Sequence, residues 1–259
     1  MIHIRSEDEI DKIRSACWLA SRAMEIVRGE IKPGITTLSL SEKAKDFIEL
    51  NGGEMAFLGY NGFPGAICVS VNDEVVHGIP GARMLGEGDI VKIDIGAYLE
   101  GFYGDMARTY PVGEIPEETE QLIKVTEQSL YEGITQAVTG KHTGDIGYAV
   151  QHFIEQRNYS VVRELVGHGI GRNLHEEPQV PNFGRSGSGP LLRNGMVLAI
   201  EPMVNAGTYK VRTLSDEWTV VTDDRKLSTH FENTCIVRDV TPEILTLMEG
   251  EEVWQKTIQ

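Results

Sequence analysis

The sequence predicts an α+β fold in which one order of elements occurs twice. Two segments with helical periodicity precede a β-rich block in residues 1–112, and two more precede a second β-rich block in residues 113–259. In addition, LGEGDIVKIDIG (85–96) aligns without a gap with LRNGMVLAIEPM (192–203). We therefore expect a single domain of two helix-helix-strand units, related by a pseudo-two-fold axis around a central antiparallel sheet.

The first half should begin with two helices. Ser6 and Glu9 match the S-x-x-E capping box, and apolar residues recur at helical intervals through residues 10–27. A second helix is expected over residues 39–50, because the Asn-Gly-Gly run at 51–53 is a typical stop signal.

Strands and then helices should follow. Residues 59–111 are rich in Val, Ile, Tyr and Gly without helical periodicity, which predicts strands joined by turns. Pro116 precedes two glutamates and should start a helix that runs to about Val138. Thr143 should open another helix that ends near Asn158, and β character resumes after it.

The internal alignment gives each half a carboxylate at the same place. Asp94 aligns with Glu201 at an offset of 107 residues, and HGIPG at His77 is echoed by HGIGR at His168. Chance and shared strand composition can explain one short match, but two matches in the same order favour duplication. We expect Asp94 and Glu201 to be placed alike in the two halves.

Glu201 ends an apolar run, GMVLAIEP, that is typical of a buried strand. A buried carboxylate without a partner costs several kcal/mol or becomes protonated, so Glu201 should have a partner. In IDIGAYLEGFYGDMART, a hairpin centred between Leu99 and Glu100 would place Asp94 opposite or diagonal to Asp105. Like charges facing each other across strands repel, which favours a cation between them.

The second half offers a matching pair, because Glu232 lies in the strand-like run HFENTCIVRD. Four carboxylates carry a charge of −4, which two divalent cations would neutralise. Taken singly, Asp105 is also compatible with a turn residue. Asp94 is also compatible with a salt bridge to Lys92 or Arg108. Taken together, the paired placement favours a dinuclear metal site.

Histidines in glycine-rich segments add candidate donors. His168 lies between glycines in VGHGIGR, where it is compatible with a metal ligand, a catalytic hydrogen-bonding group or a turn residue. His77 and His175 have similar neighbours, and the helical H-E-x-x-H zinc signature is missing at HEEPQ. One imidazole with four carboxylates favours manganese, iron or cobalt over a thiolate-type zinc site.

Composition excludes several classes of protein. Hydrophobic residues make up 41% and charged residues 24% of the 259 residues, as in ordinary globular proteins. The apolar runs are far shorter than the roughly 20 residues that span a bilayer. A net charge of −15 argues against nucleic-acid binding. The N-terminus does not resemble a signal peptide and the three cysteines are scattered, so we expect a cytoplasmic protein without membrane partners.

Five segments together resemble the type I methionine aminopeptidases, which have the pita-bread fold. They are VNDEVVHGIP, VKIDIGAYLEGFYGDMART, VGHGIGRNLHEEP, GMVLAIEPMV and DEWTVVTDDRKLSTHFENT, and the resemblance covers essentially the whole chain. Aminopeptidase P and prolidase use a similar ligand set, so the joint occurrence of these segments gives the resemblance its specificity. It implies a cytoplasmic monomer that removes the initiator methionine from nascent chains, at the ribosome, when the second residue is small.

The resemblance also implies roles for individual residues. Two divalent ions, cobalt, manganese, iron, zinc or nickel, would be held by Asp94, Asp105, His168, Glu201 and Glu232. Asp105 and Glu232 would bridge the ions. Glu201 would also act as the general acid/base, and His77 and His175 would contact the substrate and the transition state. The methionine side chain would bind among Tyr60, Phe63, Cys68 and Trp218.

Spacing and departures refine this resemblance. Only 26 residues separate His175 from Glu201, too few for the helical insertion of type II members, and we expect neither the N-terminal domain of proline-specific relatives nor a zinc-binding extension. Departures from the bacterial pattern surround the expected pocket and should change its shape and inhibitor preference: Phe57, Phe63, Asn173 and Leu174. A proline-specific exopeptidase and a non-enzymatic binding protein on the same fold are the alternatives.

Overall fold

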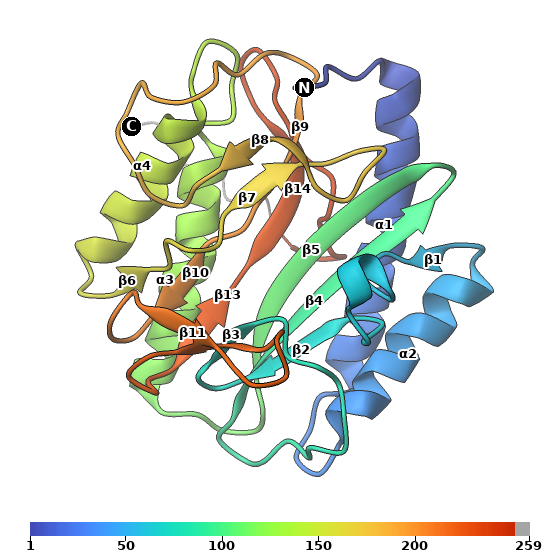
Figure 1. The fold of residues 1–259 in the computed structure, drawn as a ribbon, viewed down its shortest axis with the longest axis vertical. Coiled ribbons are helices and arrows are strands. Elements are labelled where there is room, and N and C mark those ends of the chain that lie inside the picture. The colour runs from blue at the N-terminus through green and yellow to red at the C-terminus, as the bar shows by residue number, and fades with distance from the viewer. Residues whose placement is uncertain (252–259) are drawn as a thin grey trace.

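The computed structural model describes residues 1–251, and its elements follow the expected order of helices and strands in two halves (Figure 1). The first half contains α1 (Glu7–Glu30), α2 (Thr37–Leu50), β1 (Glu54–Met55), the 3-10 helix η1 (Tyr60–Gly62), β2 (Cys68–Val71), β3 (Glu74–Val76), β4 (Ile90–Leu99) and β5 (Phe102–Pro111). The second half contains α3 (Glu117–Ile134), α4 (Thr143–Glu155), β6 (Ser160–Val161), β7 (Gly167–Gly169), β8 (Glu176–Val180), β9 (Val197–Ile200), β10 (Met203–Asn205), β11 (Val211–Thr213), β12 (Val220–Thr222), β13 (Ser228–His230), β14 (Glu232–Ile236) and β15 (Glu243–Ile244).

The first two helices begin where capping side chains satisfy their first amides. Ser6 accepts a hydrogen bond from the Glu9 amide and Glu9 accepts one from the Ser6 amide, which confirms the capping box of α1. The α3 helix ends four residues before the predicted Val138, because the chain there turns to pair with Arg238. No helix within residues 1–251 is long and apolar enough to cross a membrane.

The central sheet has the symmetry that the duplication requires. Its strands run in the order β1-β4-β5-β14-β9-β7-β8, with β2 also on β4 and β15 on β14, and all of these pairs are antiparallel. The strands β5 and β14 lie in the middle, and β4 and β9 flank them on equivalent sides. In Figure 1, α1 and α2 lie together on one side of the molecule and α3 and α4 together on the other.

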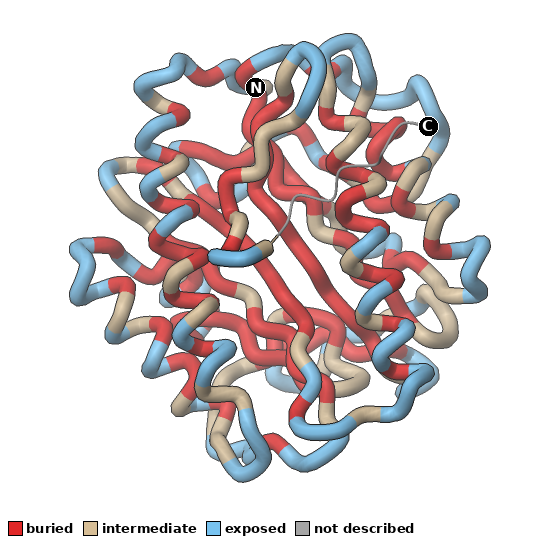
Figure 2. Tube along the Cα trace, turned by 180° about the vertical axis from the view of Figure 1, so that it is seen from behind, coloured by how far each residue is buried: buried red, intermediate tan, exposed pale blue. Residues whose placement is uncertain are grey.

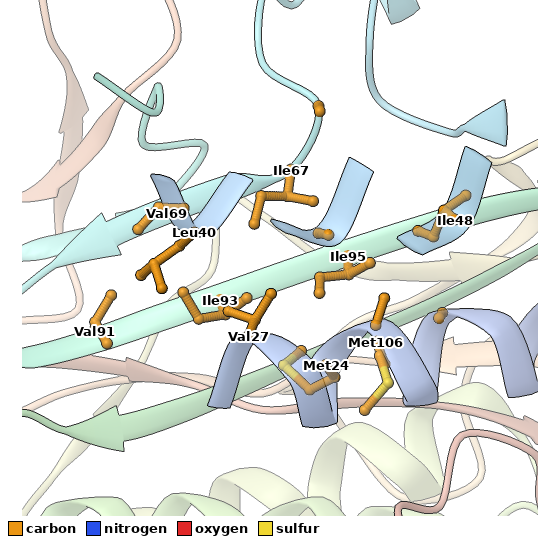
Figure 3. Packing of buried hydrophobic residues seen from close by; sticks show 14 of the residues in the cluster. Met24, Val27, Leu40, Ile48, Ile67, Val69, Val91, Ile93, Ile95 and Met106 are labelled. Atoms are coloured by element: carbon orange, nitrogen blue, oxygen red, sulfur yellow. The ribbon is translucent and has the colours of Figure 1, made fainter. Parts of the chain in front are cut away.

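Alternate residues of the central strands face different layers. Seen from behind, the long strands are buried along almost their whole length (Figure 2). Figure 3 shows one face packed against α1 and α2, through strand and helix residues Val91, Ile93, Ile95, Met106, Met24, Val27, Leu40 and Ile48. Because side chains alternate along a strand, Asp94 and Asp105 point to the other face.

The hairpin that carries these two aspartates differs from the prediction by one residue. Its turn is Glu100–Gly101, both with positive φ (52° and 88°), so it is centred between these residues and not between Leu99 and Glu100. Positive φ at both positions is what a two-residue type I′ hairpin turn requires. Asp94 pairs with Ala107 and is therefore diagonal to Asp105 on the same face.

The strand register also corrects two details of the repeat. Ala199 pairs with His168, and its counterpart Lys92, 107 residues earlier, pairs with Ser70. His168 therefore corresponds to Ser70, and the echo between the HGI segments does not reflect the duplication.

The expected match between Asp105 and Glu232 is also wrong. Ile93 pairs with Arg108, and its counterpart Ile200 pairs with Asn233, so β5 residues correspond to β14 residues 125 positions later. On this register Glu232 corresponds to Ala107, with which it also pairs. Asp105 corresponds to His230, the last residue of β13.

Candidate metal centre and active site

The residues predicted from the sequence for catalysis, metal binding and substrate binding line one cavity. Its volume is about 180 Å³, and Phe57, Asn61 and Leu174 complete its lining. The predicted residues in the lining are Tyr60, Phe63, Cys68, His77, Asp94, Asp105, His168, His175, Glu201, Trp218 and Glu232. The fold therefore brings together residues that lie up to 172 positions apart in the chain.

The carboxylates converge because three neighbouring strands present them on one face. Asp94, Ala107 and Glu232 form a row across β4, β5 and β14. Asp105 lies two residues from Ala107 and so faces the same way. Glu201 directly follows Ile200, which pairs with Asn233, and thus emerges beside this row.

A subset of these side chains is close enough to share one metal ion. Asp105, His168 and Glu232 each have a ligand atom within 4.8 Å of the others. Nε2 of His168 is 3.6 Å from Oε1 of Glu201. Nδ1 of His168 is 3.0 Å from the Gly169 carbonyl oxygen, which can only accept, so Nδ1 carries the proton and Nε2 presents its lone pair to the carboxylates.

Burial makes the carboxylates hard to ionise. It raises the pKa of Asp94 to about 7, and burial together with the neighbouring carboxylates raises the pKa values of Asp105, Glu201 and Glu232 well above their usual range. Burial also lowers the pKa of His168 to about 3, so this imidazole is neutral and brings no compensating charge.

The nearby basic side chains are engaged elsewhere. Nζ of Lys92 donates to the Asn72 carbonyl, and the Arg108 guanidinium donates to Glu251 and to the backbone of Glu232. Among residues 1–251 no salt bridge joins Asp94 to either of them, so that alternative for Asp94 is wrong. Asp105 lies inside β5, which excludes the turn alternative.

The donor set fits divalent metal ions. Oδ1 of Asp94, Oδ1 of Asp105 and Oε1 of Glu232 are buried and have no hydrogen-bond partner among residues 1–251. Buried oxygens of this kind normally have partners, and a cluster of acids with raised pKa values lacks positive charge. Carboxylates with one neutral imidazole are donors that hard and borderline divalent ions accept.

Aromatic side chains close the cavity beside this cluster. Nδ1 of His175 lies 2.8 Å from the Tyr60 hydroxyl, and the rings of Phe63 and Trp218 meet edge to face at 5.2 Å. The Phe57 ring covers Gly96 so closely that any Cβ at Gly96 would clash with it. The cavity therefore has an apolar part next to a metal-binding part.

The histidine His230 was not predicted from the sequence. It is 1% exposed, neither ring nitrogen has a hydrogen-bond partner among residues 1–251, and Nε2 lies 3.9 Å from Oε2 of Glu201. A signal was present, because alternate residues of an extended run face the same side and His230 is two residues before Glu232.

Comparison with known proteins agrees with this geometry. The model of Metallopeptidase family M24 matches residues 11–239. The methionine aminopeptidase of Clostridium perfringens is 50% identical over 249 residues, which cover 96% of this chain and all of that protein. The crystal structure of methionine aminopeptidase from Rickettsia prowazekii superposes with a TM-score of 0.94 at 44% identity and covers 95% of this chain and all of that one.

A more distant structure shares the fold alone. The prolidase of Pyrococcus horikoshii superposes with a TM-score of 0.77 at 22% identity, over 96% of this chain but 64% of that one. The two methionine aminopeptidases, by contrast, are matched over their own full length at 50% and 44% identity. The chain belongs to metallopeptidase family M24 and, within it, to the methionine aminopeptidases.

Proposed function

We propose that this protein is a metal-dependent aminopeptidase that removes the initiator methionine from polypeptides whose second residue is small. One observation carries the proposal: four carboxylates, of which Asp105 and Glu232 are buried and Asp94 and Glu201 are partly buried, line one small, partly apolar cavity. Within residues 1–251 no lysine or arginine forms a salt bridge with any of them. Relatives that are 50% identical over nearly the whole chain are methionine aminopeptidases, which supports it.

The metal centre would hold two divalent ions, which balance the charge of four carboxylates. Asp94, Asp105, His168, Glu201 and Glu232 would hold these ions, with ligands from both halves of the chain. Bound ions of this kind lower the pKa of a coordinated water toward neutrality and polarise the scissile carbonyl. Cobalt, manganese, iron, zinc and nickel are all compatible with this donor set.

Side chains of the protein would move the protons and orient the peptide. Glu201 would accept the proton of the attacking water at a carboxylate oxygen and deliver it to the leaving amine. Burial lowers the pKa of His77 to about 4 and also lowers that of His175, so both rings are neutral at pH 7 and can donate one N–H. We infer that they hydrogen-bond the scissile amide and the oxygen that becomes negative in the transition state.

The apolar part of the cavity would bind the methionine side chain. Tyr60, Phe63, Cys68 and Trp218 line it, and sulfur-to-aromatic contacts favour a thioether there. Phe57 and Leu174 reduce the space, so the pocket should admit an unbranched side chain. We also propose that the protein acts as a cytoplasmic monomer on nascent chains at the ribosome, with residues 1–112 and 113–259 as the halves of one catalytic domain.

Hydrolysis of Met-Ala-Ser by the metal-stripped protein, reloaded in turn with manganese, iron, cobalt, nickel or zinc without oxygen, tests the proposal. We expect no turnover without metal and release of free methionine with at least one ion. Met-Leu-Ser should react much more slowly. Preference for a peptide with proline in the second position, with residues other than methionine released, would instead identify a proline-specific exopeptidase.

A further inference from the structure

His230 and Asp105 occupy equivalent places in the two halves of the molecule. The register of the paired strands relates β5 to the second half by 125 residues, which places His230 where the first half has Asp105. Asp105 is diagonal to Asp94 in the first half. In the same way, His230 lies beside Glu201, the counterpart of Asp94, with Nε2 3.9 Å from Oε2.

Hydrogen bonds that play no part in the register assignment support this equivalence. The hydroxyl of Thr234 bonds both the amide (3.3 Å) and the carbonyl (2.8 Å) of Asp105. The hydroxyl of Thr109 bonds both the amide (3.0 Å) and the carbonyl (2.8 Å) of His230. Thr109 and Thr234 are themselves separated by 125 residues. In each half a threonine hydroxyl thus bonds the backbone of the equivalent residue in the other half; we call these two sets of hydrogen bonds the threonine clamps.

The ring of His230 lacks the partners that a purely structural histidine would have. Both ring nitrogens are buried and without a hydrogen-bond partner among residues 1–251, although its backbone is fully bonded through Thr109. A buried polar side chain without partners lowers stability unless something else satisfies it. A carboxylate lies close to this ring, because Oε2 of Glu201 is 3.9 Å from Nε2 of His230.

The carboxylate of Glu201 lies between two imidazoles. Oε1 is 3.6 Å from Nε2 of His168, and Oε2 is 3.9 Å from Nε2 of His230. The imidazole ring of His230 offers at least one N–H in either protonation state. His168 presents a lone pair on its side, whereas His230 can present an N–H to the other oxygen, directly after a small shift or through one water.

We propose that His230 is a positioning residue that fixes the orientation of the Glu201 carboxylate by donating a hydrogen bond to Oε2. The inference rests on the proposed function of Glu201 as a metal ligand and general acid/base. Outer hydrogen-bond partners of metal ligands typically change metal affinity or activity by about 10- to 100-fold. His230 thus occupies the place that the metal ligand Asp105 has in the first half, but it would orient the metal ligand Glu201 and not bind metal itself.

Two variants separate the hydrogen bond from the volume of the side chain. H230L keeps a side chain of similar size but removes the N–H donor. H230Q keeps an N–H donor at a similar distance from the backbone. We expect H230L to lower kcat for Met-Ala-Ser about 10- to 100-fold with little change in KM, and to weaken Mn²⁺ binding by a similar factor in calorimetry. We expect H230Q to recover most of both losses.

A matched control distinguishes positioning from a structural role. Thr229 is the neighbouring buried residue, and its hydroxyl bonds Thr126 and the Val204 carbonyl on the opposite face of the strand. T229V should lower Tm and leave kcat within twofold. H230L should show the opposite pattern, a Tm of the metal-free protein equal to or above wild type with reduced kcat, because leucine removes buried nitrogens that have no partner.

The outcomes are separable from failure of the proposed function. If wild type does not hydrolyse Met-Ala-Ser, the proposed function is wrong, and the Mn²⁺ titrations of H230L and H230Q still test the positioning role. In an E201Q background H230L should cause no further loss of kcat. Wild-type kcat and Mn²⁺ affinity in H230L, or an equal loss in H230L and H230Q, would overturn the inference.

Discussion

The two halves of the molecule share one strand framework but supply different donors. At equivalent places the first half has Asp94 and Asp105, and the second has Glu201 and His230. The second half also adds two donors where the first half has small side chains: Glu232 corresponds to Ala107, and His168 corresponds to Ser70. The two halves therefore share the backbone positions of the site, and they differ in the donor side chains at these positions.

This difference has a physical consequence for the site. The first half contributes carboxylates that are set by one continuous hairpin, in which ten residue pairs are in register. The second half contributes both carboxylates and imidazoles from short strands, β7, β9 and β14. We expect the first half mainly to contribute rigidly held carboxylates for metal binding. We expect the second half to contribute the residue that transfers protons.

The largest effect should come from exchanging the two equivalent carboxylates for amides. E201Q should lower kcat by about 10²- to 10⁴-fold with little change in KM, because the general acid/base is lost. D94N should mainly weaken metal binding and regain activity as the metal concentration is raised. Steady-state kinetics over a metal titration separates the two, and wild-type turnover by E201Q would disprove the assignment.

A smaller effect should come from breaking the ion pair that joins the N-terminal segment to the segment around His175. Arg5 and Glu176 form an ion pair with side chains only 4% and 6% exposed, and Glu176 also accepts from the Asn173 amide. R5Q leaves a buried carboxylate without its partner, which should lower the free energy of unfolding by about 3–5 kcal/mol. Denaturant unfolding measures this loss.

The control for R5Q is an exposed ion pair on the same loop. Arg172 pairs with Glu9, and the Arg172 side chain is 61% exposed. R172Q should therefore change the free energy of unfolding by no more than about 1 kcal/mol. Equal losses in R5Q and R172Q would show that burial of the Arg5 pair contributes little.

The next effect concerns stability without metal and its dependence on pH. The pKa of Asp94 is raised to about 7 in the folded protein, from 3.8. A carboxyl with a raised pKa binds more protons when folded, so its contribution to stability is present at low pH and is lost as pH rises through 7. Metal-free D94N should therefore gain stability relative to metal-free wild type between pH 5.5 and 8.5.

Thermal melting of both proteins checks this expectation. In a domain of this size each kcal/mol moves Tm by roughly 2–4 °C. Taking the difference between D94N and wild type cancels the groups that do not interact with Asp94. Removing the Asp94 charge also lowers the pKa values of Asp105, Glu201 and Glu232, which adds to the gain of D94N in the same direction. A difference that is independent of pH would contradict a folded-state pKa of Asp94 near 7. With bound metal we expect the advantage of D94N to disappear.

Local signals in the sequence were sufficient for much of this architecture. The capping box at Ser6 places the start of α1, and the alternating strands around a glycine predict the hairpin of β4 and β5 to within one residue of the observed turn at Glu100–Gly101. The ungapped match of Asp94 with Glu201 gives the correct correspondence of β4 and β9, because both strands follow a similar turn at a glycine with positive φ. Such features depend on residues that are close in the chain.

The correspondence of Asp105 with His230 could not be found in the same way. The offset between the halves is 107 residues for β4 and β9 but 125 for β5 and β14. The strands β10 and β13 continue the pairing of β9 with β14 in the same register, and the two-residue turn of the first half is replaced by a long excursion through β11 and β12. An ungapped comparison fails across such an insertion. The position of His230 beside Glu201 instead depends on the pairing of His230 with Met203 across that excursion.

The smallest effect should come from the two threonine clamps, which test the symmetry itself. T234V removes the hydroxyl that bonds the Asp105 backbone, and T109V removes the hydroxyl that bonds the His230 backbone. Each variant leaves one backbone amide and one carbonyl without this partner, so each should lower the free energy of unfolding by about 1–3 kcal/mol. Denaturant unfolding of both metal-free variants measures the two losses. If the two clamps are equivalent, the two losses should agree within about 0.5 kcal/mol. A loss in only one variant would mean that the two clamps have the same geometry but contribute differently to the free energy of unfolding.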